Sequence, residues 1–571
     1  MRKHLKKIAL VLCAALLMTG CGNAASGDSS SAGNGKNSAG SYKVSEKTVP
    51  MYLLSMDESE DVTLYFINDG NVPYISVKTI ADTLGEKKFS LEYDDAKSHA
   101  IVRNANGHYS ANMDFVNDTI TFNDYDAFFM EEGRALVDIG DLGVMELSKK
   151  IDFLTNDRYG HEMVFDLKKY DIDLVKSGDG YYIPLQTASD LFFSYKYFYA
   201  LYNGEAVFLT QNLEDKMEAE YYKASTADTI PEDLALFSYK ELCLALDNLY
   251  GLKETHNISN FESFIEEEGL DIDLKSTNVI DKDKALYELI TCYLDDLHSV
   301  FGSPSYLTDK AAFNKEVEGI YGPSSYNFRE DGRSFREART KVFPEGFSPY
   351  QEIGDTAYIT FDLFSAPSKS VDYKSEPKEE ELGDTIRLMQ YSCDKILRPG
   401  SPIKNVVMDL SLNMGGDCGS ASYVIGTFLG TGHMHTINTL TGATTTSSYY
   451  IDTNRDGLFD NKDTLRGKGL NLYCLISPVS FSCGNLVPNV FMYSPYVTLL
   501  GMTSGGGSCT VQPLSTAYGT EISISGNRRL SVFKNGSFYD IDRGAQPDYK
   551  ISRIEDFYDR NKLTNFINGL I

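Results

Sequence analysis

The sequence is short of paired cysteines and of positive charge, and each shortage excludes a class of protein. Nine cysteines occur in 571 residues and none forms a CxxC pair, so neither a zinc site nor a disulfide framework is predicted. With 53 Lys and Arg against 81 Asp and Glu, the formal net charge is -28. Such a charge repels nucleic acids and anionic membrane surfaces, so neither is expected as an electrostatic partner.

The chain also lacks a long apolar run. The longest N-terminal one, from Ile8 to Met18, follows several Lys and Arg residues and is too short to span a bilayer comfortably. It ends in Thr-Gly-Cys, which resembles the lipobox of bacterial lipoproteins and implies cleavage before Cys21 and acylation of its thiol. We therefore expect residues 1–20 to be a lipoprotein signal peptide, with ordinary signal cleavage as the alternative. The protein would be exported and anchored by lipid to the outer face of a bacterial cell membrane.

The rest of the chain is too long for one hydrophobic core. Residues 21–41 are rich in Ser, Gly, Ala and Asn and predict a flexible linker. Beyond them we expect a multidomain α+β protein with a β-rich, stalk-like domain over residues 42–212. A helical segment over 213–345 and a mixed α/β core over 346–571 would follow.

The predicted N-terminal domain contains an internal repeat. Tyr74 to Asp82 and Tyr182 to Asp190 each follow a Gly-containing turn, begin as a strand and continue as a short helix, for which Thr79 and Thr187 are the expected N-caps. The repeat resembles the stalk-like N-terminal modules of copper amine oxidases. That resemblance implies a spacer or a binding module and does not imply copper.

Near Ile230 the hydrophobic period changes from two to about 3.6, which predicts helices. The stretch from Ser238 to Glu241 fits a capping box and Gly251 fits a helix stop. A second predicted helix leads directly into His298, which would lie in its last turn, where the carbonyl dipoles favour a protonated imidazole. A plain helix-capping role for His298 is the alternative.

The C-terminal part alternates buried strand-like runs with helices, which predicts a mixed or parallel sheet. The predicted strands are Tyr358 to Leu363, Val406 to Leu410, Leu472 to Ile476 and Val497 to Leu500.

Two loops that follow these strands carry the candidate chemistry. One contains Gly415 and Gly416, whose backbone amides could face an oxyanion. In the other, Ser482 stands on a strand-to-helix turn, so the amide of Cys483 would be placed to hold negative charge. This geometry is suited to acyl transfer.

The ordered set of short motifs resembles the C-terminal-processing (tail-specific) peptidase family, in its branch with the tricorn core and interphotoreceptor retinoid-binding protein. The resemblance implies a ClpP/crotonase-like core, Ser482 as the nucleophile, and an oxyanion hole from Gly415 or Gly416 together with the amide of Cys483. The motifs are Leu297 to Ser299, Ala357 to Ile359, Asp409 to Gly416, Phe481 and Ser482, Leu500 to Gly506, and Gly544 to Asp548.

The sequence departs from the Ser/Lys dyad of the classical branch, because Gly505 to Cys509 holds no lysine. The tricorn-like branch uses a histidine, which implies His298 as general base and then general acid. Asp540 and Asp542 are the candidates for the carboxylate that orients it, with Asp542 favoured. Asn485 stands where many relatives carry an acid, so a degenerate, substrate-binding protein is an alternative.

The interval between His298 and Tyr358 is too short for the peptide-binding PDZ domain that many relatives insert, so none is expected. The partner would be an extended peptide or protein substrate, held by addition to a sheet edge. No cofactor is expected to be required for catalysis.

A separate motif over residues 452–463 matches the spacing of a calcium-binding loop, with glycine at its sixth position. A structural Ca²⁺ is expected there, and an acidic surface turn is the alternative. The predicted ligands are Asp452, Asn454, Asp456, Leu458, Asp460 and Asp463.

Three functions remain open from the sequence. The first is a lipid-anchored serine endopeptidase, the second a catalytically inactive peptide-binding lipoprotein, and the third an envelope adhesion or scaffold protein centred on residues 42–212. Labelling of Ser482 by an active-site probe would distinguish the first from the other two.

Overall fold

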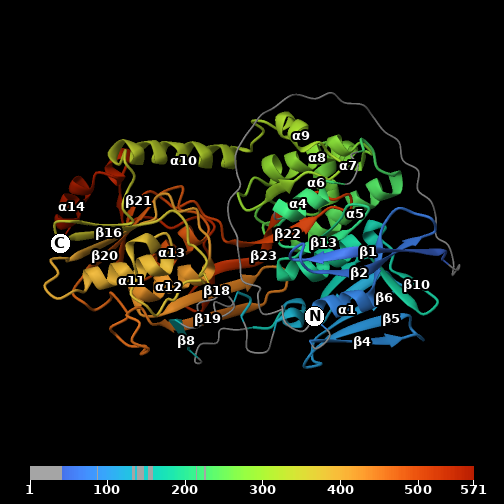
Figure 1. The fold of residues 1–571 in the computed structure, drawn as a ribbon, viewed down its shortest axis with the longest axis horizontal. Helices are drawn as coiled ribbons and strands as arrows, with labels where there is room; N and C mark the ends of the chain where they lie inside the picture. The colour runs from blue at the N-terminus through green and yellow to red at the C-terminus, as the bar shows by residue number, and fades with distance from the viewer. Residues whose placement is uncertain are drawn as a thin grey trace.

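The computed structural model describes residues 42–85, 88–130, 135–137, 147–151, 158–213, 215–223, 227–368 and 370–570. They form a multidomain molecule that mixes helices and sheets, as the sequence predicts, and the molecule has two lobes (Figure 1). One lobe, blue to green, holds most of the N-terminal half, and the other, yellow to red, holds most of the C-terminal half. Residue Cys21 and the predicted signal peptide lie outside the described residues.

The N-terminal part contains a seven-stranded sheet in the order β10-β11-β3-β2-β1-β13-β12. Its long first strand pairs antiparallel with β2 and parallel with β13, so the two ends of this part of the chain meet in one sheet. The strands are β1 (Val44–Leu53), β2 (Ser59–Ile67), β3 (Tyr74–Ser76), β10 (Val175–Ser177), β11 (Gly180–Pro184), β12 (Tyr199–Tyr202) and β13 (Val207–Thr210).

The two copies of the predicted repeat are strand-helix units that lie side by side. Strands β3 and β11 pair antiparallel and lead into helices α1 (Val77–Gly85) and α3 (Leu185–Ala188). The repeat is therefore confirmed, but its expected caps are wrong. The Ser76 hydroxyl accepts the amide of Thr79 at 3.0 Å, and α3 contains its own threonine.

A second N-terminal sheet has five strands in the order β4-β5-β6-β7-β9. All neighbouring pairs are antiparallel, and one face packs on a short aromatic helix, α2. The elements are β4 (Phe89–Asp94), β5 (His99–Asn104), β6 (Ser110–Asp114), β7 (Thr119–Phe122), α2 (Tyr125–Phe129) and β9 (Met163–Asp166).

The middle of the chain is helical, as predicted, but its principal helix begins earlier than the capping-box motif suggests. Helix α5 starts at Glu232, so the stretch from Ser238 to Glu241 lies inside it, and its end at Leu249 agrees with the predicted stop. The elements are α4 (Asp215–Tyr221), α5 (Glu232–Leu249), α6 (Phe261–Glu267), α7 (Asp271–Lys275), α8 (Val279–Glu288), a π-helical turn Leu289–Leu294, α9 (Lys310–Glu316) and α10 (Pro323–Val342).

A six-stranded sheet in the order β15-β16-β17-β20-β21-β25 forms the centre of the C-terminal lobe. The predicted strands are confirmed, and β16, β17, β20 and β21 are parallel. The strands are β15 (Tyr350–Ile353), β16 (Thr356–Thr360), β17 (Asn405–Asp409), β20 (Asn471–Ile476), β21 (Val497–Gly501) and β25 (Tyr549–Lys550).

Both faces of this sheet are buried because side chains alternate along each strand. Val406 and Met408 join one core cluster with three helices, and Val407 between them joins another with α10 and α14. Figure 1 shows these helices on opposite sides of the sheet. The helices are α11 (Thr385–Ile396), α12 (Cys418–Leu429), α13 (Cys483–Met492) and α14 (Arg560–Asn568).

A further seven-stranded sheet draws strands from all parts of the chain. Its order is β14-β23-β18-β19-β8, with β22 and β24 also paired to the long strand β23. Two of its strands, β8 and β14, precede residue 346, so the sheet crosses the domain boundaries expected from the sequence. The strands are β8 (Ser148–Lys150), β14 (Val300–Ser303), β18 (Gly432–Asn438), β19 (Thr444–Ile451), β22 (Cys509–Ser515), β23 (Glu521–Lys534) and β24 (Ser537–Asp540).

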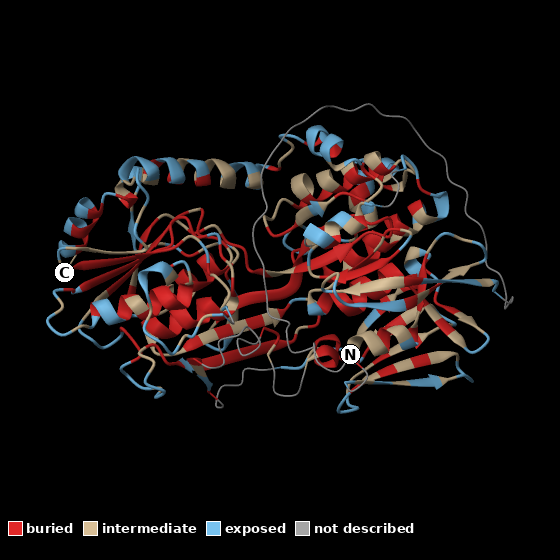
Figure 2. Cartoon of the chain, in the orientation of Figure 1, coloured by how far each residue is buried: buried red, intermediate tan, exposed pale blue. Residues whose placement is uncertain are grey.

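Buried polar contacts join the N-terminal modules to this sheet. The amide of Asn438 donates to both oxygens of Asp126, at 3.0 and 2.9 Å, and that of Gln512 donates to the Ser194 hydroxyl at 2.8 Å. Figure 2 shows the long strand β23 buried along much of its length between the lobes. The modules are thus docked against the core, and a role as spacer or binding module stays a prediction.

Residues 299–357, all of them described, fold into β14, α9, α10, β15 and the start of β16. That segment contains no PDZ domain, in agreement with the sequence. Among the described residues no helix is both long and apolar enough to cross a bilayer.

Two buried carboxyl groups meet between the N-terminal sheet and α5. Burial raises the pKa of Asp190 to about 8, and burial together with the charge of Asp190 raises the pKa of Glu241 well above its usual range. Because the folded state keeps protons that the unfolded chain releases, this contribution to stability is complete below pH 3.8 and is lost as the pH rises through about 8. We expect the melting temperature to be higher at pH 5.5 than at pH 8.5 by on the order of 3 °C.

The matched test is Asp190→Asn, which removes one ionisable group and keeps the shape. The variant should lose most of the difference between the two pH values in a thermal melt. An identical pH dependence in wild type and variant would show that the pair does not titrate on unfolding.

Candidate active site

Ser482 lies on the turn between β20 and α13, as the sequence predicts, and is the N-cap of that helix. Its backbone has φ 55° and ψ −123°, a region that residues with a Cβ rarely adopt. A backbone hydrogen bond stabilises the strained turn: the Ser482 amide donates to the carbonyl of Gly506 at 2.9 Å. Such a turn projects a serine hydroxyl from the end of a sheet, as in a nucleophile elbow.

Gly415 is pressed against Ser482. A Cβ on this glycine would lie 2.6 Å from the Cβ and 3.0 Å from the Oγ of Ser482, and its φ of 107° is itself open only to glycine. Gly416 is similarly confined, since its own Cβ would lie 2.3 Å from the carbonyl oxygen of Phe364. The glycine pair therefore lets the glycine loop pack closely against its neighbours, Gly415 against the Ser482 side chain and Gly416 against the Phe364 backbone.

The two glycine amides differ in their availability to an oxyanion. That of Gly415 donates to the side-chain oxygen of Asn413 at 2.9 Å. Among the described residues the amide of Gly416 has no acceptor, and its residue is half-buried. Gly416, together with the Cys483 amide at the first position of α13, is thus the better candidate for an oxyanion hole.

His298 reaches the same place from the other lobe. Its ring packs on that of Phe481, the neighbour of Ser482, with centroids 4.6 Å apart. No hydrogen bond joins His298 to Ser482 in the structure, and catalytic hydrogen bonds are often long before substrate is bound. The side chain is buried, and burial lowers its pKa below the ordinary 6.5.

The expected helix-end setting of His298 is wrong. The π-helical turn ends at Leu294, and Asp295 and Leu297 then take positive φ angles of 41° and 67°. His298 therefore lies in a bend that leads into β14, away from the helix carbonyls. Its imidazole is kept neutral by burial, which is the protonation state that a general base requires.

The charges of two carboxylates affect the pKa of His298, and one of them, Asp542, is the carboxylate favoured from the sequence. The charges of Asp296 and then Asp542 oppose the lowering of its pKa. Asp296 also accepts the amides of His298 and Ser299, at 3.0 and 2.6 Å, and so fixes the bend. Asp542 accepts the amide of Ser508, whereas Asp540 is engaged by Arg529 at 2.6 Å.

One strand positions both halves of the site. Ser523 of β23 pairs with Val300, two residues after His298, and the amide of Ser525 donates to the Ser299 hydroxyl. Six residues along the same strand, Arg529 pairs with Cys509 at the end of the glycine-rich stretch. The strand therefore links the segment of His298 to the loop that borders Ser482.

That glycine-rich stretch has no room for the lysine of the classical branch. A Cβ on Gly506 would lie 2.1 Å from the Asp542 carbonyl oxygen, and one on Gly507 would lie 2.5 Å from the ring of Phe481. Asn485, where relatives carry an acid, has a structural role. Its amide donates to the carbonyl of Ile541 at 2.9 Å and ties α13 to the segment before Asp542.

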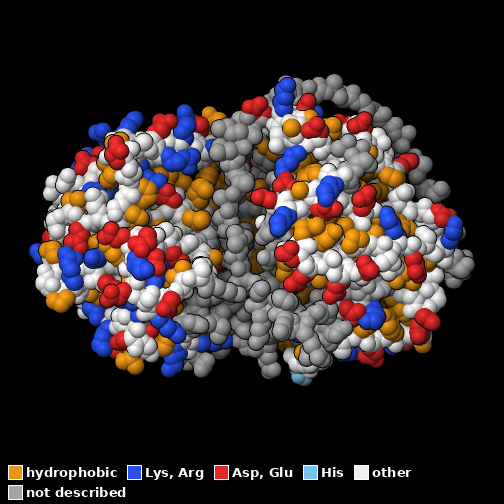
Figure 3. Space-filling model, in the orientation of Figure 1, with side chains coloured by type: hydrophobic (Ala, Val, Ile, Leu, Met, Phe, Trp, Pro, Cys, Tyr) orange, Lys and Arg blue, Asp and Glu red, His pale blue; other side chains and the backbone are white. Residues whose placement is uncertain are grey.

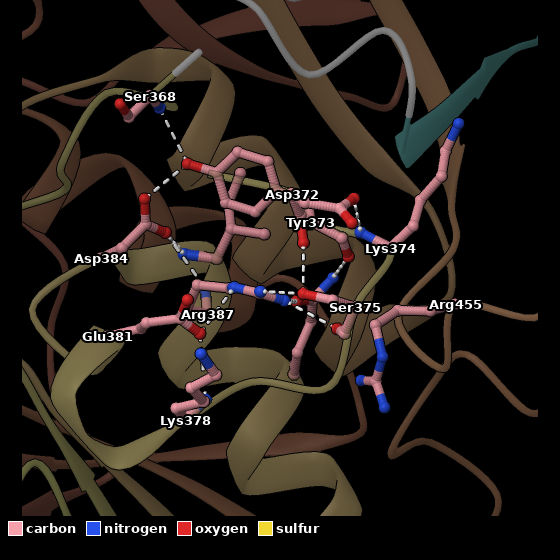
Figure 4. Close-up of polar contacts among 12 residues, drawn as sticks. Ser368, Asp372, Tyr373, Lys374, Ser375, Lys378, Glu381, Asp384, Arg387 and Arg455 are labelled. Carbon is pink, nitrogen blue, oxygen red and sulfur yellow. Dashed lines mark hydrogen bonds and ion pairs between the residues drawn. The ribbon is translucent and has the colours of Figure 1, made fainter. Parts of the chain in front are cut away.

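A loop that the sequence analysis did not single out supports the glycine turn. Residues between β16 and α11 are held by Arg387, whose guanidinium donates to the carbonyl and hydroxyl oxygens of Ser375 at 2.8 and 2.7 Å and pairs with Glu381 at 3.2 Å (Figure 4). In the same loop the Tyr373 hydroxyl donates to Asp384, the N-cap of α11. The fully buried arginine thus fastens the loop to the helix.

The beginning of this loop runs beside the glycine turn. The Phe364 amide donates to the Gly415 carbonyl at 2.7 Å, and the Asp417 amide donates to the Phe364 carbonyl at 2.8 Å. Asp417 is the buried N-cap of α12, and burial raises its pKa to about 7. The fastened loop therefore fixes the direction of the Gly416 amide.

The predicted calcium loop folds as a series of tight turns. Side-chain oxygens accept loop amides: Asp452 that of Gly457 at 3.0 Å, and Asp463 those of Thr453 and Asn454. Within the described residues no group of three or more His, Cys, Asp or Glu side chains is gathered closely enough to hold a metal. One oxygen of buried Asp452, Oδ1, has no partner.

Residues 355–551, which include both loops of the site, match the model of peptidase family S41. No curated protein matches the chain. Among solved structures, a lipoprotein from Streptococcus agalactiae is 13% identical with a TM-score of 0.34 and covers 58% of this chain and 96% of its own.

The photosystem II D1 C-terminal processing protease is 12% identical with a TM-score of 0.33, and covers 56% of this chain and 92% of its own. The tricorn protease is 10% identical with a TM-score of 0.31, and covers 89% of this chain and 43% of its own. These scores are low, and the family match carries the assignment. The domain over residues 355–551, which holds Ser482, is therefore assigned to peptidase family S41, the C-terminal-processing peptidases, and the chain is a serine-type peptidase acting on peptides or proteins.

Proposed function

We propose that this protein is an exported, lipid-anchored endopeptidase that cleaves extended polypeptide segments through an acyl-enzyme on Ser482. The observation that carries the proposal is the strained turn of Ser482, which packs against Gly415 and follows Phe481, on whose ring that of His298 packs. The lipid anchor is supported by the motif that ends at Cys21.

In the proposed reaction, neutral His298 takes the proton of the Ser482 hydroxyl as its oxygen attacks the substrate carbonyl carbon. The amides of Gly416 and Cys483 stabilise the negative oxygen of the tetrahedral intermediate. His298 then gives its proton to the leaving amine, and the acyl-enzyme is hydrolysed by water activated in the same way. Asp296 positions His298 by holding its backbone bend, and Asp542 stabilises the imidazolium by charge.

The expected substrate is an extended chain with loose sequence preference. Backbone pairing with a sheet edge recognises extended polypeptide without reading most side chains. On the face shown in Figure 3, acidic and basic side chains are intermixed over both lobes, which is consistent with a partner selected by conformation more than by charge.

A second candidate function is peptide binding without catalysis. The missing hydrogen bond between His298 and Ser482 favours it. A fluorophosphonate probe added to the purified protein separates the two, because only an activated serine forms the covalent adduct. We expect mass spectrometry to locate the adduct on Ser482, and an unlabelled protein that still binds peptides would favour the second function.

We also propose that the loop from Asp452 to Asp463 binds Ca²⁺ as a structural ion. The spacing of its oxygen ligands supports this, as does the unpartnered Oδ1 of buried Asp452, which needs a positive partner or a proton. The ammonium group of Lys462 stands 3.6 Å from Asp460 and 3.8 Å from Asp456 and would have to yield to the ion. Because the loop lies outside the catalytic groups, the ion has no role in the reaction.

Calcium is therefore expected to raise the melting temperature by a few degrees. A hundredfold excess of ligand over its dissociation constant stabilises a native state by about 2.7 kcal/mol. The measurement is a thermal melt in chelator and in millimolar Ca²⁺, with the double variant Asp452→Ala, Asp456→Ala as control. The same melting temperature for wild type in both conditions would leave the loop as an acidic turn.

A further inference from the structure

Two thiols face each other beside the nucleophile. The Sγ atoms of Cys418 and Cys483 lie 3.5 Å apart, although 65 positions separate them in the chain. Each is the first residue of its helix: Cys418 begins α12, directly after the glycine turn, and Cys483 begins α13, directly after Ser482. No disulfide is present among the seven cysteines of the described residues.

This pair differs from the other cysteines of the described part of the chain. Cys393, Cys474 and Cys509 are buried, and burial raises the pKa of each thiol, which keeps it in the unreactive protonated form. Cys418 is half-exposed, whereas Cys483 is buried. An accessible thiol with a second one in contact is the arrangement by which a mixed disulfide forms and is then resolved.

We infer that Cys418 and Cys483 are a reversible redox pair whose disulfide lowers the activity of the adjacent catalytic serine. The oxidant is a low-molecular-weight disulfide. The Cys418 thiolate attacks one of its sulfurs and releases the first small thiol, and Cys483 then attacks Sγ of Cys418 and releases the second. Two protein thiols are oxidised and one small disulfide is reduced to two thiols.

Closure of the bond disturbs the site because the thiols stand on the two loops that form it. An S–S bond is about 2.05 Å long, so the sulfurs must approach by roughly 1.5 Å. That movement is taken up at the starts of α12 and α13, next to the two amides proposed to bind the oxyanion: Gly416 lies two residues before Cys418, and Cys483 is itself the first residue of α13. Gly415 is already packed against Ser482, so the two loops cannot move closer without displacing one of these residues. A misplacement on the order of 1 Å is enough to cost about a hundredfold in rate.

The test uses the full-length protein, incubated with oxidised glutathione and then alkylated. We expect mass spectrometry of the digest to give a cross-linked peptide pair that joins Cys418 to Cys483, lost on treatment with dithiothreitol. Peptidase activity should fall at least about tenfold in the oxidised protein and return on reduction. The activity measurement rests on the proposed function, whereas the cross-link is read by mass alone, so the two can fail separately.

Cys418→Ser is the diagnostic variant and should keep full activity in oxidised glutathione. Cys292→Ser removes a half-exposed thiol that does not belong to the pair. This variant should lose activity in oxidised glutathione as wild type does. Absence of the cross-linked peptides after equilibration with oxidised glutathione would overturn the redox pair. Equal inactivation of Cys418→Ser and wild type would place the sensitive thiol elsewhere and overturn the switch.

Discussion

Ser482→Ala is expected to lower kcat/KM for peptide hydrolysis by at least about ten-thousandfold and to abolish fluorophosphonate labelling. The hydroxyl is the only group of the turn placed to form the acyl-enzyme in the proposed mechanism. Removing it leaves only the oxyanion amides and substrate binding. The fold should be retained, because the hydrogen bonds that this residue makes to other described residues involve its backbone amide and carbonyl.

Ser494→Ala is the matched control. This serine is half-buried and lies just beyond the end of α13, at the opposite end of that helix from Ser482. It should be labelled and hydrolyse peptides like wild type. Labelling of Ser482→Ala at the wild-type rate would show that another residue is the nucleophile.

His298→Ala is expected to lower kcat/KM by at least about a hundredfold, the usual scale for a general base. Since burial lowers the pKa of His298 below 6.5, the neutral imidazole predominates at pH 7. In wild type, activity should fall on the acid side of pH 6.5 as the ring gains a proton. The variant should lose that acid limb along with most of its rate.

His108→Ala serves as the control, because this histidine is exposed in the N-terminal module. It should change neither the rate nor the pH profile. If His298→Ala keeps full activity while Asp542→Ala abolishes it, the base must lie elsewhere than at the bend before β14.

The catalytic loops could be predicted from the sequence because each is a local pattern. A buried β-branched run followed by a glycine turn or a serine turn specifies strand, turn and helix within about ten residues. The resemblance to a peptidase family then depends on the order of such blocks. These features predicted that the loops of Ser482 and of Gly415 and Gly416 lie together, and the structure brings Gly415 against Ser482.

The backbone conformation around His298 could not be predicted from the sequence in the same way. The apolar stripe of the preceding helix continues in period to Leu297, yet the backbone leaves the helix after Leu294. Asp295 and Leu297 adopt positive φ there, and although Asp is enriched in that conformation, Leu is not, so the residue types do not predict the bend. Tertiary pairing of β14 with β23 overrides the local preference, and it joins positions more than 200 residues apart.

Other functional contacts were missed because they are made entirely by tertiary structure. Asp296 directly precedes the motif Leu297 to Ser299, but its hydrogen bonds to the amides of His298 and Ser299 depend on the fold of the bend. The contact of Cys418 with Cys483 depends on two helices starting side by side. Arg387 is an ordinary helical arginine in the sequence, and only the loop folded over it makes it a buried anchor.

The ladder between β14 and β23 also sets how much of the chain must be kept together for function. A fragment that begins at residue 346 would retain Ser482, the glycine turn and β23. It would omit His298 and β14, the strand through which His298 is held on β23. An insertion or register slip in that ladder would move the proton acceptor relative to the nucleophile while each lobe kept its own core. Variants of this kind would fold normally but lose activity. Any truncation or domain exchange should therefore preserve the pairing of β14 with β23.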